Sequence, residues 1–242
     1  MTEEKKILIT GEDGLCRPIW AANEPLMQHY YDTEWGVPIT DEQGMFERVC
    51  LEGFQSGLSW RTVLVKREAF REHFEGFDPD AVAQFDADDV EIIKADPRVI
   101  RSGPKIQAAI KNARATLELR ERAGQIRDEL AEGVSVDELS EEDTRLLGFE
   151  LPNGMYVDDG LAALMWSYRP KVTPTPSSFT EIPTQSEESV TLAKALKKRG
   201  FSFVGPTTVY AMMEACGIVD THLVGSHRRG ISGLWNEDGT AK

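Results

Sequence analysis

The stretch that decides the fold is Lys194–His222, KALKKRGFSFVGPTTVYAMMEACGIVDTH. Helical spacing of its apolar residues predicts one helix over 187–199 and a second helix over 206–216. The link between them, GFSFVG at 200–205, begins and ends on glycine. Pro206 suits the first turn of the following helix, because an amide at that position has no partner within the helix. The stretch therefore predicts two helices joined by a tight turn.

A turn of this kind can point backbone N–H groups and a helix N-terminus at a phosphate. The pair over about 187–217 resembles a helix-hairpin-helix DNA-binding element. The alternative is a helical hairpin with ordinary glycine punctuation, whose KALKKR segment is only a solvated face. The candidate DNA contacts are Lys197, Lys198, Arg199, Gly200, Gly205 and Thr207.

Helical patterns also dominate the part of the chain that precedes this pair. Capping residues and apolar spacing predict helices that begin after Asp41, Ser59, Asp78 and Asp86, and a further helix over 106–119. Sustained period-two alternation is absent from the sequence. The expected fold is an all-α helical bundle.

The expected organisation is an N-terminal tail over 1–19 and a single helical domain in two lobes over 20–242. Residues 120–159 are acidic and contain GVSVDELSEED, so we expect an acidic insertion outside the core. Residues 169–189 are rich in proline, serine and threonine, which predicts an extended connection.

Composition limits the classes of protein. The chain has 242 residues, 40% of them hydrophobic, and three cysteines, which are too few for a disulfide framework. No apolar run approaches the roughly 20 residues of a membrane helix, and MTEEKKILIT lacks the apolar core of a secretory signal. These features predict a soluble cytoplasmic protein with no membrane partner. The net charge of -14 argues against a polyanionic partner unless basic residues gather locally.

The second helix is followed by Val219-Asp-Thr-His222. In the helix-hairpin-helix glycosylase superfamily, a VDTH string at this place supplies a catalytic aspartate, and the resemblance implies this role for Asp220. A carboxylate there could stabilise developing oxocarbenium charge or orient the attacking water. The alternative is that Asp220 caps a following turn.

Two N-terminal strings, YYDTEWGVP at 30–38 and FERVCLEGFQSGLSW at 46–60, accompany these motifs. Together with KALKKRGFSFVG and ACGIVDTH they resemble the DNA-3-methyladenine glycosylase I family over about 20–115 and 161–225. The resemblance implies that Glu52, Tyr30 and Trp60 bind a methylated base. We also assign Glu52 as a catalytic carboxylate and expect Trp35 to lie in the pocket wall or in the core. The alternatives are core packing for each aromatic residue and a surface charge for Glu52.

The chemistry of these residue types agrees with that role. Tyr30 and Trp60 offer flat faces between which an extruded base could be sandwiched, and Glu52 could accept hydrogen bonds from its edge. An alkylated purine carries positive charge, so aromatic faces and a carboxylate favour it over a normal base. The resemblance implies a monofunctional glycosylase that hydrolyses the N-glycosidic bond of N3-methyladenine in duplex DNA. A non-catalytic DNA- or protein-binding module and a glycosylase for a different lesion remain alternatives.

The chain departs from the family where the family holds zinc with two cysteines and two histidines. Cys16 is displaced and His222 is retained, but Tyr31 and Ser226 stand at the other two positions. Tyrosine and serine are poor zinc ligands, so we expect no cofactor and direct packing of the two termini. A rearranged set would require His29 and His227 beside Cys16 and His222.

Asp220 is a second departure, because typical members carry asparagine there. We therefore expect Asp220 to assist catalysis. No lysine stands in the hairpin, where bifunctional relatives carry one, so we expect hydrolysis without strand cleavage. The expected partner is duplex DNA with alkylated bases, and the resemblance implies a monomer.

Overall fold

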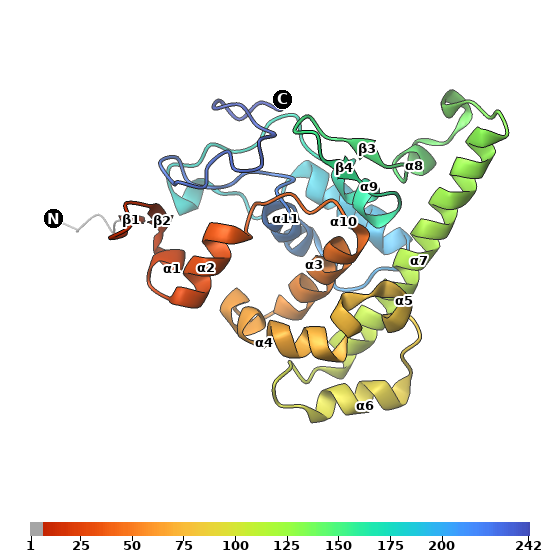
Figure 1. Cartoon of the computed structure of the whole chain (residues 1–242), viewed down its shortest axis with the longest axis horizontal. Coiled ribbons are helices and arrows are strands. Elements are labelled where there is room, and N and C mark those ends of the chain that lie inside the picture. The colour runs from red at the N-terminus through yellow and green to blue at the C-terminus, as the bar shows by residue number, and fades with distance from the viewer. Residues whose placement is uncertain (1–6) are drawn as a thin grey trace.

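Helix α3 (Glu42–Gln55) lies at the centre of the fold and packs against four α-helices. These are α4 (Trp60–His73), α7 (Gly103–Ala131), α9 (Leu161–Trp166) and α11 (Pro206–Ala215) (Figure 1). The computed structural model describes residues 7–242. All residues of 45–54 in α3 except Glu47 are buried, as expected for a helix at the centre of the core.

The prediction of an all-α fold is confirmed, because the strands in the described residues form only two short antiparallel pairs. The strands are β1 (Leu8–Thr10) with β2 (Cys16–Pro18), and β3 (Phe149–Glu150) with β4 (Tyr156–Val157). The remaining α-helices are α1 (Ile19–Ala22), α2 (Pro25–Thr33), α5 (Pro79–Val82), α6 (Ala87–Ala95), α8 (Glu141–Thr144) and α10 (Glu187–Lys198). Short 3-10 helices lie at Glu75–Phe77, Val136–Glu138 and Phe179–Glu181.

Helix starts follow the predicted caps. The side chain of Asp41 accepts a hydrogen bond from the Gly44 amide at the start of α3, and Ser59 accepts one from Thr62 at the start of α4. Asp86 forms a capping box at the start of α6. These local contacts fix where each helix begins before any tertiary packing is considered.

Helices α10 and α11 form the predicted helical pair. Gly200 has φ +90°, a left-handed conformation that glycine adopts at little cost, and it ends the first helix. The side chain of Asn112, on α7, holds the link by bonding both the amide and the carbonyl of Ser202, at 2.8 and 3.2 Å. The turn is therefore fixed by the long helix as well as by its own glycines.

Part of the expected N-terminal tail is structured. Residues 8–10 pair with residues 16–18, and Arg17 of this hairpin is buried. The expectation of a tail is wrong for 8–18, because the Arg17 side chain bonds to Asp32 of α2 and the backbone carbonyl of Cys16 accepts a hydrogen bond from the His227 amide. Residues 1–6 of the expected tail lie outside the described residues.

The expected insertion at 120–159 is not outside the core. Helix α7 continues to Ala131, and buried apolar side chains of the segment join the main core at Ala123, Ile126, Leu146 and Val157. Ion pairs neutralise part of its acid, including Arg122 with Asp143 and Arg127 with Asp159. The abundance of acidic residues concealed the helical spacing of its apolar positions. No helix within residues 7–242 is long and apolar enough to cross a membrane.

Candidate active site

A cavity of about 430 Å³ lies between α2, α3, α4 and α11. Tyr30, Trp35, Glu52 and Trp60 all line it, so the structure brings together the four predicted base-binding residues of the N-terminal half. The other lining residues are Trp20, Met27, Gln55, Ser59, Arg61, Phe179, Ile182, Ala211 and Glu214.

Tyr30 and Trp60 form one aromatic wall instead of two opposing faces. Their ring centroids are 5.3 Å apart with an interplanar angle of 42°, which is the geometry of two rings in direct contact. No base fits between rings at this separation. The expectation that Tyr30 and Trp60 sandwich the base is therefore wrong in this conformation, although both rings face the cavity.

Arg48 lies behind this wall and was missed by the sequence analysis. Its guanidinium group donates a hydrogen bond of 3.0 Å to the Tyr30 hydroxyl and lies 5.2 Å from the Trp60 ring centroid. It is 5% exposed and lies 4.0 Å from Glu52, one helical turn away on α3. The spacing of four residues between Arg48 and Glu52 was the available sign of this contact.

Glu52 is a buried carboxyl group, only 4% exposed. The alternative of a surface charge is therefore wrong. Burial raises its pKa to about 7, because desolvation disfavours the ionised form more than Arg48 favours it. A positively charged ligand in the cavity would favour the ionised form.

The cavity opens toward the helical pair. A neighbouring hollow of about 370 Å³ shares Glu52, Gln55 and Ala211 with it and extends to Thr207 and to the loop at 56–58. Leu58 in this loop is 42% exposed. The N-terminus of α11, with the predicted contact Thr207, therefore borders the opening of the cavity.

Lys105 supports the loop at this opening. Its ammonium group donates hydrogen bonds to the backbone carbonyls of Phe54 and Ser56, at 2.9 and 2.5 Å, and so satisfies groups that α3 leaves unpaired at its end. Burial lowers the pKa of Lys105. Sequence reasoning had no basis for this contact, which joins positions about 50 residues apart.

The basic residues before the hairpin turn have other partners. The ammonium group of Lys198 lies 2.6 Å from a carboxylate oxygen of Glu142, and Arg199 lies 4.0 Å from the same side chain. Lys198 and Arg199 line a small cleft with Glu142 that shares no residue with the base cavity. Lys197 is exposed. Two of the three predicted cations are thus partly neutralised by α8.

Asp220 does not line the cavity. Its carboxylate accepts hydrogen bonds from the amide and Nδ1 of His222, at 3.0 and 2.8 Å, and from the Gly230 amide at 2.8 Å. The group is 4% exposed, and these donors occupy both oxygens. This geometry does not fit the predicted catalytic role and corresponds to the alternative of a turn cap. Asp220 fastens the C-terminal segment.

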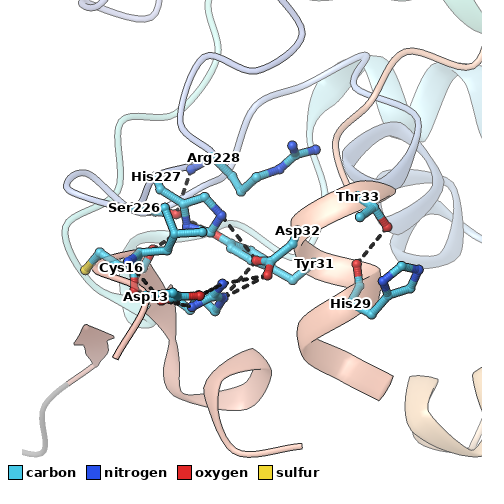
Figure 2. Close-up of polar contacts among 11 residues, drawn as sticks. Asp13, Cys16, His29, Tyr31, Asp32, Thr33, Ser226, His227 and Arg228 are labelled. Carbon is cyan, nitrogen blue, oxygen red and sulfur yellow. Dashed lines mark hydrogen bonds and ion pairs between the residues drawn. The ribbon is translucent and has the colours of Figure 1, made fainter. Parts of the chain in front are cut away.

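A polar clasp joins the hairpin β1–β2 and α2 to the C-terminal segment (Figure 2). The hydroxyls of Tyr31 and Ser226 lie 2.5 Å apart. The Asp32 carboxylate accepts a hydrogen bond of 2.7 Å from the Arg17 guanidinium group, and its other oxygen lies 3.2 Å from Nε2 of His227. We use "terminal clasp" for Arg17, Tyr31, Asp32, Ser226 and His227.

The residues at the expected ligand positions do not fit the zinc site that the sequence resemblance implies. Tyr31 and Ser226, which stand at two of the expected ligand positions, bond to each other. Asp220 bonds Nδ1 of His222 and leaves its buried Nε2 without a hydrogen-bond partner among the described residues, so the misfit lies at Tyr31 and Ser226. In Figure 2 the Cys16 sulfur points away from the Tyr31–Ser226 contact, and His29 lies apart and exposed. Among the described residues, no three His, Cys, Asp or Glu side chains gather closely enough to hold a metal ion.

Comparison with known proteins places the chain in a family. The sequence profile described as methyladenine glycosylase matches residues 20–146 and 155–229. The chain belongs to the methyladenine glycosylase family. Only residues 147–154 lie between the two matched parts, so most of the segment at 120–159 also belongs to the family pattern.

Relatives within the family span nearly the whole chain. It is 42% identical to DNA-3-methyladenine glycosylase 1 of Escherichia coli over 210 residues, which are 85% of this chain and 92% of that protein. It is 37% identical to DNA-3-methyladenine glycosylase of Haemophilus influenzae, over 84% of this chain and 92% of the relative.

Solved structures of the family agree. A crystal structure of 3-methyladenine DNA glycosylase I has a TM-score of 0.71 and 38% identity, and the match covers 87% of this chain and 98% of that chain. A structure of 3-methyladenine DNA glycosylase I from Staphylococcus aureus, described as showing the basis of 3-methyladenine recognition, has a TM-score of 0.66 and 27% identity. The match covers 86% of this chain and 93% of that chain.

Proposed function

We propose that this protein is a monofunctional DNA glycosylase that hydrolyses the N-glycosidic bond of N3-methyladenine in duplex DNA. Membership of the methyladenine glycosylase family supports this proposal. The observation that carries it is the shared cavity, where Tyr30, Trp35 and Trp60 present aromatic faces around the buried carboxyl group of Glu52.

The lesion suits this cavity for an electrostatic reason. N3-methyladenine bonded to its sugar carries positive charge, which aromatic faces and an ionised Glu52 stabilise. Water attacks C1′ of the sugar while the C1′–N9 bond breaks, and the base leaves with the bonding electron pair as a neutral molecule. The attacking water becomes the C1′ hydroxyl and releases one proton to solvent. A cationic base is already a good leaving group, so the main task of the protein is to hold the extruded base.

The DNA would approach at the opening of the cavity. There the N-terminus of α11 offers unpaired amides to a phosphate, beside Thr207. Leu58 stands exposed on the loop that Lys105 holds, and we propose that it occupies the space left by the extruded base. Gly205-Pro206 stands in the hairpin region where a lysine would be needed for strand cleavage, so the product is an intact strand with an abasic site.

The terminal clasp supports the further proposal that the protein works without zinc, with its two terminal segments held by direct hydrogen bonds. Asp220 contributes indirectly: it orients His222, whose ring lies 4.5 Å from the Trp35 ring in the cavity wall. Its role is therefore that of a positioning residue.

Single-turnover release of free base from methylated duplex DNA tests this function. We expect the wild type to release 3-methyladenine and to leave the strand uncut, and Glu52→Gln to be slower by about a hundredfold. A panel of deaminated and otherwise alkylated duplexes separates the alternatives. Release of another base only would indicate a different lesion, and DNA binding without release of any base would indicate a non-catalytic module.

A further inference from the structure

Glu214 is a second acidic residue in the base cavity. It lies on α11, one turn after Ala211, and both side chains line the cavity with Glu52. Thr221 donates a hydrogen bond of 2.6 Å from its hydroxyl to Oε1 of Glu214. Thr221 is buried and belongs to the VDTH string. The threonine of this motif, and not its aspartate, therefore bonds to an acidic side chain of the cavity.

We propose that Glu214 is a second base-recognition residue, which together with Glu52 makes this cavity select purines that carry a positive charge. This inference rests on the proposed function and adds a residue to its site. Glu214 reaches the cavity from the helical pair, whereas Glu52 reaches it from α3. A base in the cavity would therefore meet acidic groups from two different elements.

The charges around the cavity support a cationic ligand. Arg48 lies 4.0 Å from Glu52 behind the aromatic wall, and Arg61 at the rim is paired with Glu24 at 2.7 Å. Within residues 7–242, Glu214 forms no ion pair, and its side chain has the Thr221 hydroxyl as its hydrogen-bond donor. With both carboxyl groups ionised, Arg48, Glu52 and Glu214 together carry one negative charge, which a base of one positive charge balances.

Ionisation of both carboxyl groups is less favourable in this cavity than in water. Burial raises the pKa of Glu214 to about 7, Thr221 opposes that shift, and the neighbouring charge of Glu52 adds to it. Burial likewise raises the pKa of Glu52 to about 7. The titratable groups near the pair are Arg48 from α3, Tyr30 from α2, Arg61 from α4, Tyr210 from α11 and Cys216 at the end of α11. Thr221 adds a neutral hydrogen-bond donor. Because a cation favours the ionised carboxylates, its affinity should rise with pH between 6 and 8.

Two small molecules test the selection directly. The 3,9-dimethyladenine cation has a fixed positive charge and mimics the base while it is bonded at N9, whereas 3-methyladenine is uncharged at pH 8. Their dissociation constants would be measured by quenching of tryptophan fluorescence for wild type, Glu214→Gln and Thr221→Val. Glu118→Gln, on the exposed face of α7, is the matched control.

We expect Glu214→Gln to weaken binding of the cation by about tenfold or more at pH 8, and binding of 3-methyladenine by less than about twofold. Thr221→Val should keep the selectivity but move the pH midpoint of cation binding upward, because it removes a donor that favours the ionised form. Equal weakening of both ligands by Glu214→Gln would indicate a structural role and overturn the inference, as would no change for either.

The proposed function is tested separately by base release. If the wild type releases 3-methyladenine from DNA and Glu214→Gln retains its preference for the cation, the inference fails and the function stands. If the wild type releases no base and binds neither small molecule, the proposed function itself fails.

Discussion

The hydroxyl groups of Tyr31 and Ser226 lie 2.5 Å apart and join α2 to the C-terminal segment. The ring of Tyr31 also stacks on Trp35, with centroids 5.7 Å apart, and Trp35 lines the base cavity. The contact between the two termini is therefore also a support for the cavity wall.

Removal of either hydroxyl should destabilise the fold. Tyr31→Phe or Ser226→Ala leaves the other buried hydroxyl without its partner and should lower the free energy of unfolding by about 1–3 kcal/mol. The double variant should lose less unfolding free energy than the two single variants added together. Thermal and denaturant unfolding would measure these changes.

The protein should need no zinc for stability or activity. Chelator treatment should leave the melting temperature and base release unchanged. Stoichiometric zinc in the purified protein, or a melting temperature lowered by chelator, would contradict this prediction.

Trp60 should contribute to base binding through its face. Trp60→Ala is expected to weaken 3-methyladenine binding by about tenfold or more, because stacking of a base on an aromatic side chain is worth about 1–3 kcal/mol, and Trp60→Phe should recover part of the loss. Val65→Ala, on the exposed side of the same helix, is the control. Equal affinities for wild type and Trp60→Ala would remove Trp60 from the site.

Glu52 should reduce stability at high pH. Its pKa is raised from 4.5 to about 7, so the folded protein holds a proton that the unfolded chain has released. The contribution of Glu52 to stability is therefore fully present below about pH 4.5 and is lost as pH rises through about 7. Glu52→Gln should be more stable than wild type at pH 8, by at most about 3 kcal/mol, and similar to it near pH 4. Denaturant unfolding at several pH values checks this, with Glu118→Gln as control; a parallel pH profile for wild type and Glu52→Gln would refute it.

Asp220 should matter for stability more than for chemistry. Asp220→Asn replaces one acceptor oxygen with a donor where His222 and Gly230 supply donors, and should cost about 1–3 kcal/mol of unfolding free energy. The single-turnover rate of base release, measured where the variant is fully folded, should fall by less than about threefold. Loss of a general acid or base typically lowers a rate by about 10²–10⁴-fold. A loss of about a hundredfold with unchanged stability would restore the catalytic role.

Lys198 should contribute little to DNA affinity because Glu142 already neutralises it. Lys198→Ala should leave the salt dependence of DNA binding nearly unchanged, whereas Lys197→Ala, which removes an exposed cation, should reduce the slope by about one. Glu142→Gln should tighten binding by releasing Lys198. A slope reduced by about one in Lys198→Ala would mean that Lys198 exchanges Glu142 for a phosphate when DNA binds.

The sequence by itself determined the helical fold, because caps such as Asp41 and Ser59 and the glycines of the 200–205 turn act locally. It also assigned Glu52, Tyr30, Trp35 and Trp60 to one site, through motifs that the family comparison supports. Tertiary structure decided what depends on contacts between distant positions. It placed Asp220 against Gly230 instead of in the cavity, paired Lys198 with Glu142, brought Glu214 beside Glu52, and set Arg48 behind the Tyr30–Trp60 wall. Hydrogen bonds and burial at such positions follow from the packing of helices, which no local pattern specifies.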